Sequence, residues 1–248
     1  MNKVERKEIR LIALDMDGTL LNSEHVVSPA NQQAIEAAKE KGVHVMLSTG
    51  RSLLTSQEYR EALKLDYHIT VNGSEIWGPT GEILERQNVP FSDIELLYQL
   101  MEKHQTQYWA VTEEKVWRNE FPVDADRHNW LKFGFQFETE DVRDALLKAL
   151  EEHGGFEISN SHPFNLEVNT LGINKANAIK KVCEKLSITM EEVLACGDSI
   201  NDLAMIREAG VGVAMGNAQP IIKEEADWVT SSHNEDGVAK AIEKFVLK

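Results

Sequence analysis

Two aspartates stand close together in the segment Asp15-Met16-Asp17-Gly18-Thr19-Leu20, directly after the apolar run of residues 11–14. A short apolar run that ends at a glycine turn predicts a buried strand. Both carboxylates then emerge at the carboxyl end of that strand, which is where ligands bind in open α/β sheets. Two acids in one tight turn repel each other unless a cation or a proton lies between them. The pair therefore indicates a divalent metal site or shared acid–base chemistry.

Two further segments carry groups suited to binding an anion. Residues 43–47 form a second apolar run that leads into Ser48-Thr49-Gly50-Arg51. Hydroxyls and backbone N–H groups at such a glycine turn form an anion site. Lys175 begins a segment in which apolar residues recur at helical spacing as far as Leu186, which predicts a helix with a lysine at its start.

A third strand end carries more acids. Residues 193–196 are apolar and lead into Gly197-Asp198-Ser199-Ile200-Asn201-Asp202. If a helix begins near Ser199, Asp198 and Asp202 lie on neighbouring faces of its first turn. The helix dipole favours negative charge there, so a structural role for the two acids is also possible.

In this order the four elements resemble the motifs of the haloacid dehalogenase (HAD) superfamily, in the Cof-type phosphatase branch that has a type IIB cap between its second and third motifs. The resemblance implies a Mg²⁺-dependent phosphomonoester hydrolase. Such an enzyme acts through an aspartyl-phosphate intermediate on a small phosphorylated metabolite, such as a sugar phosphate. It also implies a doubly wound, Rossmann-like α/β core.

The resemblance implies a role for each matching residue. Asp15 attacks phosphorus, and Asp17 protonates the leaving group and then deprotonates water, with Thr19 orienting Asp17. Mg²⁺ is held by Asp15, the backbone carbonyl of Asp17 and Asp198, and Asp202 lies just behind these ligands. The phosphoryl oxygens are bound by Thr49, Gly50, Lys175, Asn201 and the backbone of Met16, with Arg51 and Asn72 near the substrate.

The assigned chemistry makes a demand on Asp17. An ordinary aspartate has a pKa of ~3.9 and is a poor acid near neutral pH. Acid catalysis by Asp17 therefore requires burial or a neighbouring negative charge that raises its pKa.

Three alternative functions share part of this set of residues. A phosphomutase would use the same residues and pass the phosphoryl group to a second hydroxyl, so product analysis separates it. A non-catalytic phosphometabolite-binding protein is disfavoured because nucleophile, acid, lysine and metal acid are all present. A phospho-acceptor signalling domain also uses an aspartate and Mg²⁺, but it would not need an inserted domain.

The composition is ordinary for a globular chain and limits the partners. The 248 residues are 42% hydrophobic and 27% charged, with a formal net charge of −15, and they suffice for one large or two modest domains. This charge argues against a nucleic-acid partner, because Lys and Arg supply affinity for a phosphate backbone. No apolar stretch approaches the ~20 residues of a membrane span. The first residues lack the apolar core of a signal peptide, so we expect a cytoplasmic enzyme without a membrane partner.

The order of the predicted elements divides the chain. Strands and helices alternate over residues 9–72 and again from 174 to 247, which predicts a parallel, doubly wound sheet. Between these segments, strand pairs separated by helices predict an α+β domain with an antiparallel sheet. We expect residues 1–80 and 172–248 to form the core and residues 81–171 to form the inserted cap that determines substrate specificity.

Local patterns predict further details. A single helix is expected over residues 53–65, and the capping-box pattern Ser92-Asp93-Ile94-Glu95 predicts the start of a helix in the cap. Residues 107–112 and 115–118 are expected to form a hairpin. Most aromatic residues of the cap are expected in the core of its small sheet rather than in a pocket: Trp109, Trp117, Phe121, His128, Trp130, Phe133, Phe135 and Phe137.

Overall fold

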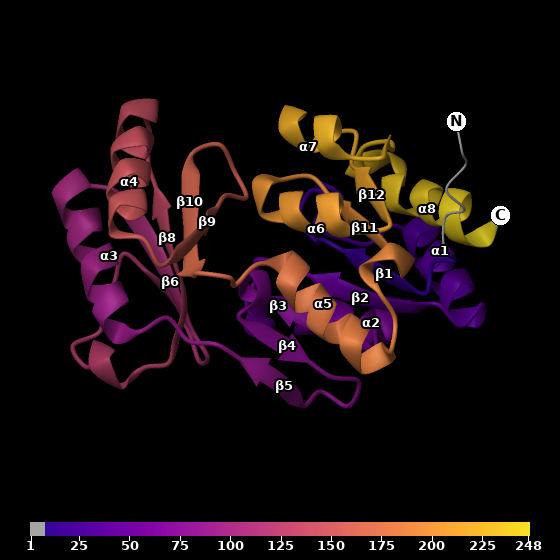
Figure 1. Cartoon of the computed structure of the whole chain (residues 1–248), viewed down its shortest axis with the longest axis horizontal. Coiled ribbons are helices and arrows are strands. Elements are labelled where there is room, and N and C mark those ends of the chain that lie inside the picture. The colour runs from indigo at the N-terminus through magenta and orange to yellow at the C-terminus, as the bar shows by residue number, and fades with distance from the viewer. Residues whose placement is uncertain (1–7) are drawn as a thin grey trace.

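The computed structural model describes residues 8–248, which form two β-sheets with their helices (Figure 1). The larger sheet has eight strands in the order β13-β12-β11-β1-β2-β3-β4-β5, and the smaller has five in the order β7-β6-β8-β10-β9. No helix in residues 8–248 is long and apolar enough to cross a membrane. The expectation about a signal peptide rests largely on residues 1–7, which lie outside the described residues.

The larger sheet is parallel from β13 to β3 and gains an antiparallel edge from β4 and β5. All residues of β1 and β11 are buried, as expected for parallel strands that are covered on both faces. This confirms the predicted doubly wound α/β core. The strands are β1 Leu11–Leu14, β2 His44–Ser48, β3 Tyr67–Thr70, β4 Glu75–Trp77, β5 Ile83–Arg86, β11 Val193–Gly197, β12 Val211–Ala214 and β13 Trp228–Val229.

Helices cover this sheet, with α1 packed beside α8 and α5 beside α6. Ser28 caps α1 by accepting a hydrogen bond from the backbone of Asn31, and Pro29 occupies the first helical turn, as its sequence predicts. The helices are α1 Pro29–Glu40, α2 Gln57–Leu63, α5 Lys175–Leu186, α6 Leu203–Glu208, α7 Pro220–Glu225 and α8 Gly237–Ile242, which continues into a π-helical turn, Glu243–Leu247.

The smaller sheet is antiparallel throughout and carries helices on one face, away from the larger sheet (Figure 1). Strands β6 and β7 pair as the predicted hairpin, whereas β8, at the centre of the sheet, is not among the predicted strands. The elements are α3 Phe91–His104, β6 Gln107–Thr112, β7 Val116–Arg118, β8 Trp130–Gln136, α4 Glu140–His153, β9 Phe156–Ser159 and β10 Asn165–Thr170.

The two faces of the smaller sheet differ because successive side chains of a strand point to opposite faces. On one face, Tyr108, Phe133 and Phe135 pack with apolar residues of α3 and α4 in a hydrophobic cluster separate from that of the larger sheet. The expectation that most cap aromatics form a core is therefore confirmed. Trp109 is the exception, because it lies on the opposite face with Lys132 and lines a cavity.

Three local expectations differ from the structure. The predicted helix of residues 53–65 is a 3₁₀ turn, Leu53–Thr55, followed by α2, because Ser56 between them is not helical and its hydroxyl donates to the carbonyl of Ser52. Helix α3 begins at Phe91 without a capping box, since Pro90 fixes the entry to the helix. Residues 83–86, expected in the cap, form β5 and pair with β4 in the larger sheet.

Candidate active site

Strand order brings the sequence motifs to one edge of the larger sheet. Strand β1 lies between β2 and β11, and Leu14 stands in register with Leu47 and with Cys196. Because these strands are parallel, the residues that follow them meet at their carboxyl ends. Asp15, Thr49 and Asp198 therefore line one cavity of about 400 Å³, as predicted for the ligand edge of an open α/β sheet.

A buried lysine joins two of the acids at this edge. Asn174 caps α5 and places Lys175 in its first turn, pointing at the strand ends. Its Nζ donates to Asp15 Oδ1 and to Asp202 Oδ1, both at 2.6 Å. Asp15, Asp198 and Asp202 each place a carboxylate oxygen within 4.8 Å of the others. Three acids thus surround one lysine, which leaves an excess of negative charge.

Burial and the charges of the cluster together shift the pKa values of Asp15, Asp198 and Lys175. Burial raises the pKa of Asp198 to about 7, and the charge of Asp202 adds to this effect. Burial also raises the pKa of Asp15 well above its ordinary value, reinforced by Asp202 and opposed by Lys175. Burial opposes the charge of Lys175, but Asp15 and Asp202 outweigh it and raise the lysine pKa. A further cation beside Asp15 and Asp198 would relieve the remaining repulsion.

Asp202 organises the loop that carries Asp198. Its Oδ2 accepts hydrogen bonds from the backbone N–H groups of Asp198, at 2.9 Å, and Ser199, at 3.1 Å. The bond from Ser199 belongs to a capping box that opens the 3₁₀ turn Ile200–Asp202 ahead of α6. The predicted helix start near Ser199 is therefore present. The Asp202 side chain is buried and holds the backbone of Asp198.

Thr19 has a different partner from the one expected. Its hydroxyl donates to Asp198 Oδ1 at 3.2 Å, so the expectation that Thr19 orients Asp17 is wrong. The cause is Gly18, which has φ +80° and turns the chain so tightly that an added Cβ would lie 2.6 Å from Asp198 Oδ2. This turn brings Thr19 under Asp198, which the sequence alone does not show.

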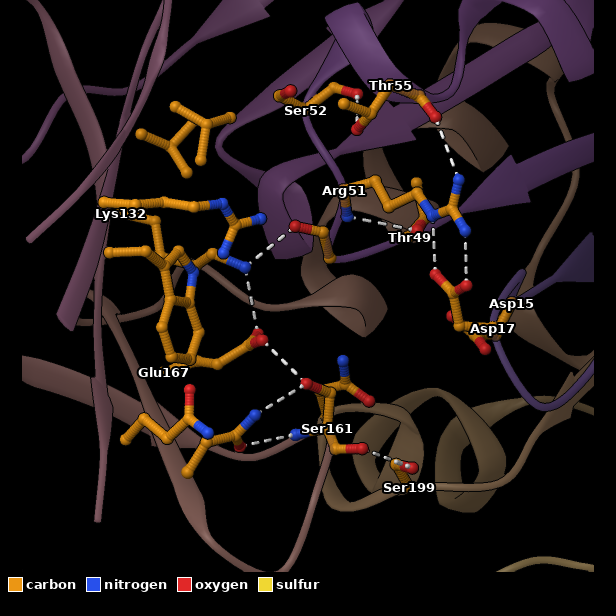
Figure 2. A pocket seen from close by; sticks show the side chains of 18 of the residues that line it. Asp15, Asp17, Thr49, Arg51, Ser52, Thr55, Lys132, Ser161, Glu167 and Ser199 are labelled. Atoms are coloured by element: carbon orange, nitrogen blue, oxygen red, sulfur yellow. Dashed lines mark hydrogen bonds and ion pairs between the residues drawn. The ribbon is translucent and has the colours of Figure 1, made fainter. Parts of the chain in front are cut away.

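Asp17 lies on the cavity wall and pairs with Arg51 (Figure 2). Arg51 donates from Nε to Asp17 Oδ2 at 2.7 Å and from Nη2 to Oδ1 at 2.5 Å, and its Nη1 donates to the carbonyl of Thr55. The Asp17 side chain is 48% exposed. An acid catalyst was expected to be buried or to have a negative neighbour. The structure shows neither for Asp17, which is half-exposed and faces a cation.

The other predicted residues divide between cavity and core. Thr49, Gly50 and Asn201 line the cavity, and Asn201 Nδ2 donates to Asn72 Oδ1 at 3.3 Å. The side chain of Met16 is fully buried in the hydrophobic core. Only its backbone is therefore available for the predicted contact with a phosphoryl group.

A buried ion pair on the smaller sheet joins the site, and the sequence analysis does not include it. Lys132 Nζ donates to the carbonyl of Gly50 at 2.8 Å and to Glu167 Oε2 at 3.1 Å, and Figure 2 shows this pair facing the Arg51 side of the cavity. Asn72 Nδ2 donates to the same carboxylate at 2.6 Å. Burial alone would raise the pKa of Glu167, but Lys132 and the hydrogen bonds lower it. Lys132 among the aromatic and aliphatic residues of the segment 130–135 was the available signal.

The turn between β9 and β10 also reaches the site. The backbone N–H of Asn201 donates to the carbonyl of Asn160 at 3.1 Å, and the Ser199 hydroxyl donates to the carbonyl of Ser161 at 3.4 Å. Together with Lys132, these contacts hold the smaller sheet over the strand ends. The cavity is thus enclosed by both sheets, and from the smaller one it is lined by Trp109, Val111, Val116, Arg118, Lys132, Gln136, Ser161, Asn165 and Glu167.

Comparison with known proteins assigns this arrangement to a family. A family model of haloacid dehalogenase-like hydrolases matches residues 12–133 and 121–242. The chain belongs to the haloacid dehalogenase-like hydrolases. It is 54% identical over 244 residues to the 5-amino-6-(5-phospho-D-ribitylamino)uracil phosphatase YcsE of Bacillus subtilis, covering 98% of each chain. It is 32% identical to the HMP-PP phosphatase of Cronobacter sakazakii, covering 87% of each.

Solved structures of HAD proteins share the whole fold. A haloacid dehalogenase-like hydrolase from B. subtilis aligns with a TM-score of 0.87 at 26% identity, covering 96% of this chain and 100% of the other. A HAD subclass IIB sugar phosphatase aligns with a TM-score of 0.82 at 27% identity, covering 95% and 98%. The chain is therefore a Cof-type HAD phosphatase, and the solved structures that share its fold include a subclass IIB enzyme.

Proposed function

We propose that this HAD phosphatase hydrolyses 5-amino-6-(5-phospho-D-ribitylamino)uracil with Mg²⁺, through a phosphoryl group carried by Asp15. The observation that carries the mechanism is the buried Asp15–Lys175–Asp202 cluster at the end of β1, which opens into the cavity. Support for the substrate comes from two relatives named for it, at 54% and 30% identity, each matched over nearly its whole length. The expectations of a cytoplasmic location and of no nucleic-acid or membrane partner remain predictions.

Asp15 is suited to act as the nucleophile. Lys175 holds its Oδ1, whereas the structure gives its Oδ2 no hydrogen-bond donor among residues 8–248. In the first step Oδ2 forms a bond to phosphorus, and the bond from phosphorus to the leaving alkoxide breaks. Asp17 supplies the proton to that alkoxide; for this, the arriving phosphoryl group must open the ion pair between Asp17 and Arg51 and place a negative charge beside Asp17, an environment that favours a protonated carboxyl. In the second step Asp17 takes a proton from water, whose oxygen attacks phosphorus, releases inorganic phosphate and restores Asp15.

The same residues hold the phosphoryl group. A lysine ammonium has three donors, and Lys175 uses two of them on Asp15 and Asp202, so one remains for a phosphoryl oxygen. Thr49, Gly50, Asn201 and the backbone of Met16 would bind the other oxygens. In-line displacement depends mainly on this kind of positioning and charge neutralisation.

The carboxylate cluster fits a magnesium ion. Carboxylate oxygens are the hard donors that Mg²⁺ prefers, and the three acids of the cluster carry more negative charge than Lys175 balances. Burial, reinforced by the charge of Asp202, raises the pKa values of Asp15 and Asp198, so a bound cation would favour their charged forms. Asp15, Asp198 and the backbone carbonyl of Asp17 would hold the ion, while Thr19 and Asp202 fix Asp198 and its loop. When bound, Mg²⁺ supplies positive charge to the transferring phosphoryl group.

A screen of phosphate release with Mg²⁺ tests the proposal. Candidate phosphorylated metabolites are ranked by kcat/KM, with 5-amino-6-(5-phospho-D-ribitylamino)uracil among them. We expect this compound at or near the top of the ranking. A phosphomutase would isomerise its substrate without releasing inorganic phosphate, and a binding protein would give neither product.

Replacing Asp198 by asparagine is expected to weaken Mg²⁺ binding by about 100-fold or more. Outer residues at metal sites are worth roughly 10- to 100-fold in affinity, and Asp198 is proposed to be a direct ligand. Isothermal titration calorimetry measures the affinity. The matched control is D144N, on the exposed surface of α4, which should bind Mg²⁺ like the wild type. An unchanged affinity in D198N would contradict the assignment.

The affinity for Mg²⁺ is also expected to depend on pH. Because the pKa of Asp198 is about 7 without metal, most molecules carry a proton on this group at pH 6 and few do at pH 8. Protons then compete with the ion, so the dissociation constant should be about tenfold higher at pH 6 than at pH 8. Titrations at both values, with D198N as the comparison, measure this difference. Equal constants in the wild type would contradict the raised pKa of Asp198 as the source of the effect, and the Mg²⁺ affinity of D198N then decides whether Asp198 is a ligand.

A further inference from the structure

The wall of the cavity formed by β6, β7 and β8 has a flat aromatic surface. We propose that Trp109 is the platform on which the planar ring of the leaving group stacks, and that Arg118 and Gln136 bind the polar edge of that ring. This inference rests on the proposed function, because it names how the site recognises the part of the substrate that is not phosphate.

Trp109 lies flat on the sheet because its neighbour is glycine. Gly134 stands directly opposite Trp109 in the β6–β8 pair. A Cβ added to Gly134 would lie 2.2 Å from Cε2 and 2.6 Å from Cδ2 of the indole, the two atoms at which its rings are fused. One face of the indole therefore covers the backbone of β8, and since Trp109 also lines the cavity, the other face is available to a ligand.

The polar groups around the indole lack protein partners. Arg118 stands opposite Trp109 on β7, and Gln136 follows Gly134 by two residues and so shares its face of the sheet. Within residues 8–248, the structure gives no hydrogen bond or ion pair to the side chains of Arg118 and Gln136 or to the Nε1 of Trp109. All three line or border the cavity.

The inner wall contrasts with this outer wall. Lys132 is bonded to Gly50 and Glu167, and Glu167 is bonded to Asn72 and Ser161. The buried charges near the phosphate end of the cavity are therefore used to hold the two sheets together. The unpaired groups lie farther out, where a leaving group attached to the phosphoryl oxygen would extend.

A planar ring with carbonyl groups fits this outer wall best. An exposed aromatic face favours stacking with another flat π surface, and an arginine beside it donates hydrogen bonds to oxygen acceptors in one plane. A plain polyol would use the donors but not the indole face. A second phosphate would use Arg118 alone, so these two alternatives predict different variant behaviour.

The test compares a substrate with the ring and one without it. For each variant, kcat/KM is measured for 5-amino-6-(5-phospho-D-ribitylamino)uracil and for ribitol 5-phosphate, and the ratio of the two values is taken. The wild type should prefer the ring compound. We expect W109L and G134A to lower the ratio at least tenfold, W109F to retain part of it, and R118Q to lower it as well.

The control is W117L, on the same hairpin but on the opposite face of the sheet, where Trp117 packs against the hydrophobic cluster that the smaller sheet forms with α3 and α4. It should leave the ratio unchanged, and thermal melts confirm folding of each variant. If W109L does not fold, the ratios measured for G134A and R118Q test the inference instead. The inference is overturned if W109L and G134A keep the wild-type ratio, or if the wild type itself shows no preference for the ring compound. In either case phosphate release would continue, and the proposed function would stand. Absence of Asp15-dependent release from both substrates would instead refute the proposed function.

Discussion

The variant D15N should lose at least about 1000-fold in kcat, which corresponds to roughly 4 kcal/mol in the barrier. Asparagine preserves the shape of the side chain and removes the oxygen that forms the bond to phosphorus. Burial and two neighbouring acids disfavour the charge of Asp15, and the asparagine oxygen can still accept the hydrogen bond from Lys175, so the fold should stay close to wild-type stability. A loss of activity in D15N can therefore be assigned to the missing nucleophile rather than to unfolding.

Two measurements check this result. Acid quenching during turnover should trap a phosphoryl group on the peptide that contains Asp15 in the wild type, and mass spectrometry should find none in D15N. Thermal unfolding of D15N serves as the control for folding. Near-normal turnover in this variant, or a phosphorylated peptide elsewhere in the chain, would rule out Asp15 as the nucleophile.

The variant K175M should lose both activity and stability. Methionine fills similar space, but it leaves Asp15 and Asp202 facing each other without the cation that now bonds to both at 2.6 Å. Removing one partner of a buried ionic group costs ~3–5 kcal/mol, which lowers the melting temperature by roughly 6–20 °C in a chain of this size. Turnover should fall by about 1000-fold because phosphoryl binding is lost as well.

The matched control for this variant is K180M on the same helix. Lys180 is 43% exposed and pairs with Glu208 at the surface, where an ion pair contributes ~1 kcal/mol or less. Calorimetry should also show that K175M still binds Mg²⁺, in contrast to D198N. A K175M variant as stable and active as K180M would mean that the buried cluster has no role in either property.

The sequence predicts the strand ends well because their chemistry is local. Apolar runs mark strands buried on both faces, and the residues that follow Leu14, Leu47 and Cys196 meet because the strands are parallel neighbours. The start of α5 was also predictable, since Asn174 is a helix cap. These features place Asp15, Asp198 and Lys175 without knowledge of the rest of the chain.

The remaining contacts depend on how distant segments pack. Nothing near Thr19 shows that Asp198, far along the chain, would be its partner, and the pairing of Arg51 with Asp17 needs the relative position of two loops. Strand β8 escaped prediction although Phe133 and Phe135 alternate with Lys132 and Gly134, because glycine is unfavourable in strands. That glycine makes sense only beside Trp109 on the neighbouring strand.

The placement of β1 between β2 and β11 also affects how the chain folds during synthesis. Strand β11 leaves the ribosome roughly 180 residues after β1, which takes on the order of 10 to 40 s at roughly 5–20 residues per second. For that time β1 has an unpaired edge, and such edges favour aggregation. The smaller sheet has its own hydrophobic cluster and is complete before β11 emerges. We therefore expect nascent chains that stop before residue 193 to bind chaperones strongly, even when their cap is already folded.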